Sequence, residues 1–479
     1  MASNILVVLT DDHAQWAAGC YGNRELRTPT LDYLASTGVR MVNAFTPSPV
    51  CSPARASFWT GRLPSQHGVH DYLAEGDPEV NAHRWLDREI TLAQILHEAG
   101  YTTGLVGKWH LGQPERRPPG FDSWYSLAAP VSRPYAVDTP WPPSPPHHAG
   151  FNRQSIADHA VAFLRGRTPD RPFFLFVGPF ATHSPWTGHA ERLVSAYRDA
   201  QFGDIPRDTT YHFGRLASES LYTTRNTPSE TWAQYYAAVT EIDEQVGRIL
   251  DELDSQHLRE ETLVVYTADH GLNLGHHGVW GKGNGTRPNN MLEESIRVPL
   301  ILNQPGTLLG GQVRSELVTH CDLFSTIVEH AGVMTPPRST PYPGRSFRDQ
   351  LRGIGKPDWP DTVFGEYGTV RMVRTLRNKL VRRYPDGPDE LFDLVADPRE
   401  TTDLSRSPEH EAVLRDLSSR IEAYFATYEE PERSGLRVRD LPRHNSEEAW
   451  RDQRPHEIVV DPSWLTAMES STATPVPDQ

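Results

Sequence analysis

Residues 4–10 read NILVVLT, and the two carboxylates Asp11 and Asp12 follow at once. A short, unbroken apolar run rich in β-branched side chains is typical of a strand that is buried on both faces of a parallel sheet. The same character recurs in three further runs, at residues 103–107, 173–177 and 262–267. The first run therefore predicts a parallel sheet with two acidic residues at the end of one buried strand.

Amphipathic stretches separate these apolar runs. They lie at residues 30–36, 91–99, 155–164 and, as the longest, 231–253. Strands that alternate with helices predict an α/β fold, in which helices flank a large, mostly parallel sheet on both faces. Ligands of such sheets bind beyond the carboxyl ends of the strands, so polar residues that follow the strands are expected to face one cleft.

The residues that follow the predicted strands are chemically unusual. In chain order they are Asp11, Asp12, Lys108, His110, His183, Asp269 and His270. Carboxylates, imidazoles and an ammonium group are the side chains that proteins use for metal binding, proton transfer and anion binding. The carboxyl edge of the sheet is therefore predicted to hold the functional site.

The pattern changes towards the C-terminus. Short strand-like pieces at residues 362–366, 370–376, 379–383 and 391–394 precede a helix-like stretch at 410–424. They predict a smaller C-terminal antiparallel sheet plus helix, packed on the main domain. We divide the chain into a catalytic domain (1–345), a C-terminal subdomain (346–430) and an extended C-terminal arm (431–479), whose end at 470–479 is expected to be disordered.

A proline-rich segment at residues 130–146 is predicted to be extended and irregular. It is either a surface excursion or a wall of the cleft, because it follows Lys108 and His110 closely. Further candidates for the cleft are Trp85, Trp124, Trp141, Trp186, Asp71, Tyr72 and His212. Aromatic faces stack on sugar or aryl rings, although packing is the expected role of at least two of the tryptophans.

Composition excludes several classes of protein. With 37% hydrophobic and 23% charged residues, this chain of 479 residues is neither a low-complexity chain nor a coiled coil. A net charge of −15 without a basic block argues against a nucleic-acid partner. Three cysteines give no disulfide framework, no apolar run is long enough to cross a bilayer, and no signal peptide is recognisable. We therefore expect a cytoplasmic protein with no membrane partner.

Cys51 opens the pentapeptide CSPAR at residues 51–55. Pro53 fits the first turn of a helix, so Cys51 is expected at a helix N-terminus, which binds anions and lowers the pKa of a thiol. Taken alone, this position indicates either a small buried apolar side chain or a reactive thiol.

The pattern Cys-x-Pro-x-Arg resembles the signature of the type I sulfatases, which are formylglycine-dependent members of the alkaline phosphatase superfamily. Further motifs of that family follow along nearly the whole chain and in the same order. They are Asp11-Asp12, GCYG (19–22), TPTL (28–31), TGR (60–62), GKWHLG (107–112), THSP (182–185), TADHG (267–271), GKG (281–283), ESIRVP (294–299) and ELFDL (390–394). On these motifs the chain is identified as a member of the family, with the family's fold as the expectation.

The resemblance implies that a separate formylglycine-generating maturation enzyme oxidises Cys51 to formylglycine. One hydroxyl of the hydrated aldehyde would attack sulfur, and the second would allow the sulfated group to collapse and release sulfate. The implied reaction is hydrolysis of an organic sulfate monoester to an alcohol and inorganic sulfate. The substrate is a small-molecule or oligosaccharide sulfate ester, and we favour a carbohydrate sulfate.

The resemblance also assigns roles to individual residues. It implies one divalent cation, held by Asp11, Asp12, Cys51, Asp269 and His270. Ca²⁺ is the ion that we favour for the carboxylates, while Mg²⁺ and Mn²⁺ stay open because His270 offers a nitrogen.

The implied catalytic side chains are Cys51, Arg55, Lys108, His110, His183 and Lys282. The two lysines would hold sulfate oxygens, His110 would assist collapse of the diol, and His183 would protonate the leaving oxygen. Arg55 would fix the converted side chain.

Two other functions are kept as alternatives. A phosphonate monoester or phosphodiester hydrolase of the same superfamily can use the same converted residue, whereas a non-catalytic, anion-binding pseudo-sulfatase would keep Cys51 unmodified. A homo-oligomer is also kept open. Residues expected to be structural are Cys20, Cys321, His67, His276 and His277.

Overall fold

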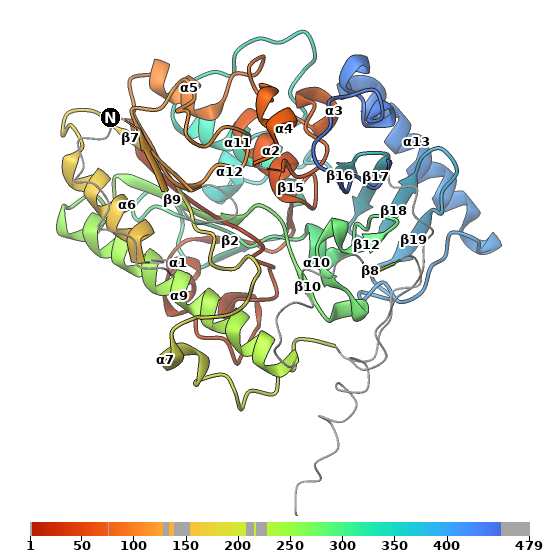
Figure 1. Cartoon of the computed structure of the whole chain (residues 1–479), viewed down its shortest axis with the longest axis horizontal. Helices are drawn as coiled ribbons and strands as arrows, with labels where there is room; N and C mark the ends of the chain where they lie inside the picture. The colour runs from red at the N-terminus through yellow and green to blue at the C-terminus, as the bar shows by residue number, and fades with distance from the viewer. Residues whose placement is uncertain are drawn as a thin grey trace, which may run out of the picture.

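The computed structural model describes residues 2–74, 76–127, 134–137, 154–206, 215–216 and 228–451 (Figure 1). Through them runs a nine-stranded sheet in the order β14-β2-β13-β9-β1-β7-β4-β5-β6. Its strands are β1 (Asn4–Thr10), β2 (Val39–Met41), β4 (Thr102–Lys108), β5 (Ser123–Leu127), β6 (Pro134–Val137), β7 (Phe173–Gly178), β9 (Thr262–Ala268), β13 (Leu300–Asn303) and β14 (Gln312–Arg314). The central block from β9 to β5 is parallel, while β13 and β6 run antiparallel to their neighbours in it.

The stretch NILVVLT forms β1, which lies in the middle of this sheet. Leu6 pairs with Val264 of β9 on one side and with Leu175 of β7 on the other. All residues of these three strands are buried. The predicted α/β class is therefore confirmed, and the four apolar runs are the adjacent strands β9, β1, β7 and β4.

The side chains of β1 alternate between two hydrophobic clusters, one on each face of the sheet. Ile5 and Val7 belong to one cluster, and Leu6 and Val8 belong to the other. The first cluster includes residues of α2 (Cys51–Thr60), α5 (Leu92–Glu98) and α11 (His320–His330), and the second includes residues of α1 (Pro29–Thr37), α6 (Gln154–Gly166) and α9 (Pro228–Ser255). Figure 1 shows these two groups of helices on opposite sides of the sheet. Successive side chains of a strand point to opposite faces of the sheet, so a strand that is apolar throughout must be covered by helices on both faces.

Shorter elements complete the main body. They are the helices α3 (Pro64–His67), α4 (Pro78–Ala82), α7 (Glu191–Val194), α10 (Glu293–Ile296) and α12 (Arg348–Leu351), the 3-10 helices at Gly19–Tyr21, His276–Gly278 and Gly283–Gly285, and the two-residue strand pairs β3 (Ala44–Phe45) with β15 (Val318–Thr319), β8 (Arg215–Leu216) with β12 (Thr286–Arg287), and β10 (Asn273–Leu274) with β11 (Trp280–Gly281). Most of them lie in the connections that follow the strands.

The predicted smaller sheet is also confirmed. It is an antiparallel sheet of β16 (Thr362–Tyr367), β17 (Val370–Thr375), β18 (Asn378–Arg383) and β19 (Glu390–Asp393), followed by a 3-10 helix at Pro408–His410 and by α13 (Glu411–Tyr428). Figure 1 shows it in blue beside the main sheet. A buried ionic cluster joins the smaller sheet to the main body. In this cluster Oε2 of Glu293 in α10 lies 3.2 Å from Nη2 of Arg374, and Oε1 of Glu293 lies 3.4 Å from Nζ of Lys379.

Beyond α13 the described part of the arm contains 3-10 helices at Pro431–Arg433 and Gly435–Arg437 and then runs to residue 451. It lies against the main body, where the backbone N–H of Ala74 donates to the carbonyl of His444 at 2.9 Å. The side-chain amide of Asn445 donates to the carbonyl of Tyr72 at 2.8 Å. The domain boundaries at residues 345 and 430 stay predictions.

Several expectations about the cleft are corrected or lie outside the described residues. Trp85, Trp124 and Trp186 are buried inside hydrophobic clusters, so packing is the role of all three. Trp141, His212 and residues 470–479 lie outside the described residues, as does the segment at 130–146 except for β6. Within the described residues, none of the helices is both long and apolar enough to cross a membrane.

Gly107 provides a test of the packing between β4 and β7. Its φ is +117°, and a Cβ at this position would lie 2.2 Å from the carbonyl oxygen of Gly178. We expect Gly107→Ala to lower the free energy of unfolding by about 2–4 kcal/mol, measured by urea denaturation, because backbone strain and overpacking add up. Gly203→Ala is the matched control, since a Cβ there meets nothing within 4 Å. If the two variants unfolded at the same urea concentration, the close packing of Gly107 against Gly178 would be contradicted.

Candidate active site

The polar residues predicted to share a cleft meet at the carboxyl ends of the central strands. Asp11 and Asp12 follow β1, and Lys108 ends β4. The Nζ atom of Lys108 lies 2.6 Å from Oδ2 of Asp11. Asp269 and His270 follow β9, and the Nε2 atom of His270 lies 3.2 Å from Oδ1 of Asp12. Parallel strands that end at the same edge bring these side chains together, as the sequence predicted.

Cys51 is the first residue of helix α2 and lies at the centre of the group. Val50 precedes it in an extended conformation, and the first helical hydrogen bond runs from the N–H of Ala54 to the carbonyl of Val50. Pro53 therefore occupies a position in the first turn where no N–H is needed, which explains how the pentapeptide starts a helix. The side chain of Cys51 is buried.

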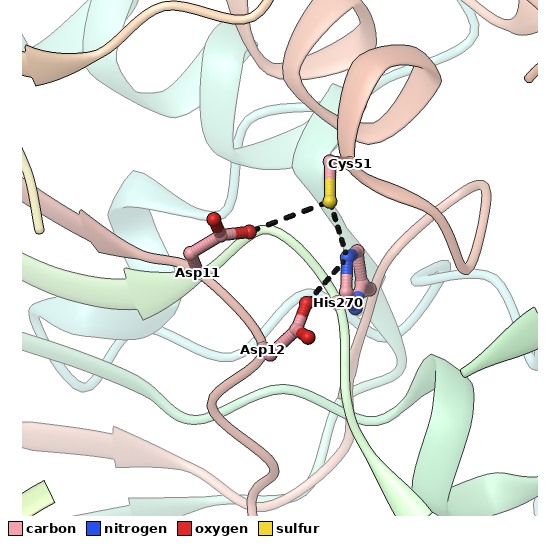
Figure 2. A group of neighbouring side chains, drawn as sticks. All are labelled: Asp11, Asp12, Cys51 and His270. Atoms are coloured by element: carbon pink, nitrogen blue, oxygen red, sulfur yellow. Dashed lines mark hydrogen bonds and ion pairs between the residues drawn. The ribbon is translucent and has the colours of Figure 1, made fainter. Parts of the chain in front are cut away.

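The thiol of Cys51 is surrounded by polar atoms (Figure 2). Its Sγ atom lies 3.0 Å from Nζ of Lys282, 3.3 Å from Nε2 of His270 and 3.4 Å from Oδ1 of Asp11. Burial opposes ionisation of the thiol, but Lys108, Lys282 and His270 together hold the pKa of Cys51 well below its usual range. The position is built to stabilise negative charge on the side chain at residue 51.

Four buried donor atoms in this group are spaced for one cation. They come from Asp11, Asp12, Cys51 and His270 and all lie within 4.8 Å of one another. A divalent ion with bonds of about 2.0–2.6 Å can touch several donors at this spacing. The residues present therefore fit the metal ion that the sequence predicts, and Figure 2 shows their side chains converging from three segments of the chain.

Asp269 is hydrogen-bonded to the backbone that carries two of these donors. Its Oδ1 accepts from the backbone N–H groups of Asp12 at 3.2 Å and His270 at 2.9 Å. Its Oδ2 accepts from Nε of Arg55 at 3.0 Å. Burial raises the pKa of Asp269 to about 7 despite these partners. The geometry gives Asp269 a bracing role, and its role as a metal ligand stays a prediction.

Arg55 is fully buried and ties three segments together. Besides Asp269, its Nη1 donates to the carbonyl of Lys108 at 3.0 Å, and its Nη2 lies 3.7 Å from Oδ1 of Asp11. These contacts fix α2 against β4, β1 and the loop after β9. Arg55 thereby orients Cys51 through its own helix, although it makes no direct hydrogen bond to the thiol in this structure.

The two lysines neutralise the carboxylates. Nζ of Lys282 lies 2.5 Å from Oδ1 of Asp12, which matches the pairing of Lys108 with Asp11. Burial opposes a charged ammonium, but the neighbouring carboxylates raise the pKa of both lysines above the ordinary value. Both are therefore cations at neutral pH and supply two positive charges beside Cys51.

His270 is held in one orientation. Its Nδ1 donates to the carbonyl of Gly271 at 2.8 Å, which leaves Nε2 directed at Cys51 and Asp12. A ring nitrogen held in this way is the usual arrangement for a metal-binding histidine. Burial opposes the charged ring, but Asp269 raises the pKa of His270 to about 9 when no cation is bound.

His110 and His183 also interact with Cys51. The Nε2 of His110 donates to the carbonyl of Leu73 at 3.0 Å, and its buried Nδ1 makes no hydrogen bond of good geometry. His183 is 24% exposed and lies with Nε2 4.0 Å from Oδ2 of Asp12. Its ring stacks on Phe180 at 4.6 Å between centroids, and Asp12 raises its pKa above the ordinary value against the effect of burial.

Several supporting residues were not identified from the sequence. Thr182 donates to the carbonyl of Asp11, and Tyr235 donates to the carbonyl of Asp12 at 3.0 Å. Asn290 donates to the carbonyl of Lys282 at 3.0 Å and accepts from Ser295. His444 of the arm accepts from the N–H of His70 at 2.9 Å and so braces the segment that holds His110. Thr182 lies in the THSP motif quoted above, but only the structure shows its contact with Asp11; Tyr235, Asn290 and His444 are single polar residues that form no pattern in the sequence.

The remaining candidates have structural partners. Asp71 is buried and accepts from the hydroxyl of Tyr367 at 2.5 Å, which links its loop to β16, and its role in the pocket stays a prediction. His67 bonds to Ser57, and His277 pairs with Glu294 at 3.0 Å. Cys321 is buried as expected, whereas Cys20 is only half-buried.

Comparison with protein families and curated proteins gives consistent matches. A family model described as Sulfatase matches residues 3–333, and one described as N-sulphoglucosamine sulphohydrolase, C-terminal, matches residues 275–427. The N-acetylglucosamine-6-O-sulfatase of Bacteroides thetaiotaomicron is 26% identical over an alignment of 506 positions. The alignment covers 89% of this chain and 87% of that protein.

Comparison with solved structures gives the same fold. The structure of BT4656 in complex with its substrate D-glucosamine-2-N,6-O-disulfate has a TM-score of 0.74 at 23% identity and covers 94% of this chain and 100% of that chain. The phosphonate monoester hydrolase of Agrobacterium radiobacter has a TM-score of 0.69 at 20% identity, with 89% and 96% covered. At these identities the two structures establish the fold alone.

Asn290 tests how the loop that carries Lys282 is held. We expect Asn290→Ala to lower the free energy of unfolding by about 1–3 kcal/mol, because the carbonyl of Lys282 loses one of its two donors and the buried hydroxyl of Ser295 loses an acceptor. Asn378→Ala is the matched control, since its half-buried amide lies on β18 and bonds to the carbonyl of Phe392. Urea denaturation measures both, and a smaller loss at Asn290 than at Asn378 would refute the bracing role.

Proposed function

The chain belongs to the sulfatase family of sulfuric ester hydrolases, and on that premise we propose that it cleaves a sulfated carbohydrate at Cys51. The observation that carries this proposal is the setting of the Cys51 side chain, which lies 3.0 Å from the ammonium of Lys282 among buried carboxylates and imidazoles. The substrate class is supported by relatives named for carbohydrate sulfates.

Conversion of Cys51 to formylglycine by a maturation enzyme is part of the proposal. The hydrated aldehyde supplies one hydroxyl that attacks sulfur and a second whose deprotonation expels sulfate. The chain supports this chemistry by fixing the side chain at the start of α2 and by placing His110 beside it. Because Nε2 of His110 donates to Leu73, its Nδ1 carries a free lone pair that can accept the proton of the second hydroxyl.

A divalent cation would lower the pKa of the attacking hydroxyl and offset negative charge on the substrate. We propose Ca²⁺, since Asp11, Asp12 and Asp269 offer the carboxylate oxygens that this ion prefers. His270 would complete the set through Nε2, and residue 51 would contribute an oxygen after conversion.

Lys108 and Lys282 are placed to bind the sulfate group. In the structure each ammonium pairs with one carboxylate, at 2.6 Å and 2.5 Å. An ammonium has three donors, so each lysine keeps donors for sulfate oxygens while it holds its carboxylate. Because both lysines are buried, their charges are weakly screened, and they stabilise the charge that spreads over the sulfate oxygens during transfer.

His183 is the residue proposed to protonate the leaving alcohol. It is the exposed member of the group, and its stacking on Phe180 fixes the ring while Asp12 favours the protonated form. A partly exposed acid at the mouth of the site suits an alcohol that departs towards solvent. The phosphonate monoester hydrolase alternative is supported only by the shared fold, and it serves as the control substrate class below.

Cys51→Ala decides the role of the converted residue. Protein made together with a maturation enzyme is expected to carry an aldehyde in peptide 41–55, detected by mass spectrometry, and to hydrolyse sugar sulfates faster than a phenylphosphonate monoester. The variant is expected to lose all measurable turnover, because no other group supplies the nucleophile. Undiminished turnover in the variant would contradict the mechanism. If the converted protein cleaved the phosphonate monoester faster than sugar sulfates, the alternative function would be assigned.

His183→Ala tests the acid. The loss in kcat/KM is expected to be about 10²- to 10⁴-fold for a sugar sulfate and much smaller for nitrophenyl sulfate, whose leaving group needs no proton. His97→Ala is the control, because His97 is 44% exposed and pairs with Asp122 away from the site. Equal losses for the two substrates would exclude protonation of the leaving group by His183.

A further inference from the structure

We propose that the unconverted chain, in which Cys51 is still a thiol, is a zinc-binding protein. The structure assigns Asp11, Asp12, Cys51 and His270 as the four corners of one tetrahedral Zn²⁺ site at the place where the converted chain holds its hard cation. Conversion of Cys51 would then change which metal the site selects. This inference concerns the precursor and stands whether or not the mature protein is a carbohydrate sulfatase.

The spacing of the donor atoms supports a tetrahedral site. Neighbouring corners lie 3.4 Å apart for Cys51 Sγ and Asp11 Oδ1, 3.3 Å for Cys51 Sγ and His270 Nε2, and 3.2 Å for His270 Nε2 and Asp12 Oδ1. A tetrahedron with zinc bonds of about 2.0–2.3 Å has edges of about 3.3–3.6 Å. The other three pairs of donor atoms lie within 4.8 Å of one another, so the side chains drawn in Figure 2 would close around the ion as it binds.

The kinds of donor atom also select zinc over calcium. One thiolate, one imidazole and two carboxylates form a set of sulfur, nitrogen and oxygen donors that suits a borderline-soft ion. Ca²⁺ takes six to eight oxygen ligands, so a sulfur and a nitrogen among four protein donors weaken its binding. Among the four donors, the sulfur of Cys51 contributes most to the preference for zinc over calcium, because thiolates strongly favour soft and borderline metals.

The surroundings prepare Cys51 and His270 for this role. The ammonium of Lys282 lies 3.0 Å from Sγ and favours the thiolate that a metal requires. The hydrogen bond from His270 Nδ1 to the carbonyl of Gly271 fixes Nε2 towards the other donors. Zinc binding would release to solvent the protons held on Cys51 Sγ and His270 Nε2, form the Zn–S and Zn–N bonds and leave Lys282 beside Asp12.

The consequence is a closed metal site in the precursor. Four protein ligands leave a tetrahedral zinc ion with no open position, which is the arrangement of structural rather than catalytic zinc sites. After conversion the thiolate is replaced by a neutral oxygen donor, and the preference for zinc is lost. An unconverted molecule is thus held in an inactive state that a calcium-loaded mature molecule does not share.

The experiment uses the full chain made without a maturation enzyme, with an intact Cys51 verified by mass and with metals removed by chelation. Co²⁺ serves as a spectroscopic probe for Zn²⁺. We expect one equivalent of Co²⁺ to give the visible bands of a tetrahedral complex together with a near-ultraviolet thiolate-to-cobalt charge-transfer band. One equivalent of Zn²⁺ should remove both signals, and a thousand equivalents of Ca²⁺ should not.

Variants separate the ligands from the other thiols. Cys51→Ser is expected to lose the charge-transfer band and to bind Zn²⁺ more weakly by over about 100-fold, beyond the loss typical of residues that only support a ligand. His270→Asn should weaken Zn²⁺ binding while the charge-transfer band persists at higher Co²⁺. Cys20→Ser is the matched control, because its thiol lies outside the donor group and should leave both signals unchanged.

Zinc X-ray absorption on the unaltered chain keeps the proposal testable if a variant fails to fold. One sulfur at about 2.3 Å and three nitrogen or oxygen neighbours at about 2.0 Å are expected. A spectrum without sulfur, unchanged Zn²⁺ affinity in Cys51→Ser, or displacement of Zn²⁺ by equimolar Ca²⁺ would each overturn the proposal.

Discussion

Three buried carboxylates lie close together at the carboxyl edge of the sheet, and they govern how the surrounding segments are arranged. Asp11, Asp12 and Asp269 come from two adjacent strands, and none of the three is exposed to solvent by more than 3%. Charges in such a place must be paired, because an unpaired buried charge costs several kcal/mol. Lys108, Lys282 and Arg55 supply the pairing, so six charged side chains from separate parts of the chain need one another.

The requirement for pairing explains how distant segments are arranged. Arg55 has to reach Asp269 from helix α2, and the same helix therefore presents Cys51 to the group. Lys282 reaches Asp12 from a loop that Asn290 holds by its carbonyl. The smaller sheet holds the next part of that loop, since Lys379 donates to the carbonyl of Met291 at 2.6 Å and Arg383 to that of Asn289. The C-terminal region thus supports the position of a lysine beside Cys51.

Residue 51 is the point at which this balance can be altered by chemistry. As a thiolate it adds negative charge and a soft donor to a group that already contains three carboxylates, and the surrounding cations stabilise that charge. As a hydrated aldehyde it would be neutral and would offer oxygen. The same scaffold then favours a hard cation and an anionic ester, because the positive side chains no longer need to compensate a thiolate.

The architecture and most residues at the carboxyl edge of the sheet were predictable from the amino-acid sequence. Short unbroken apolar runs rich in β-branched residues favour buried strands, and helices between them favour a parallel sheet whose carboxyl edge collects Asp11, Lys108 and His270. The contacts that each of these residues makes are visible only in the tertiary structure. It showed that Asp269 accepts from the backbone N–H groups of Asp12 and His270, and it placed Trp124 and Trp186 in the core. It also revealed Asn290 and His444, because a hydrogen bond between loops far apart in the chain leaves no periodic pattern in the sequence.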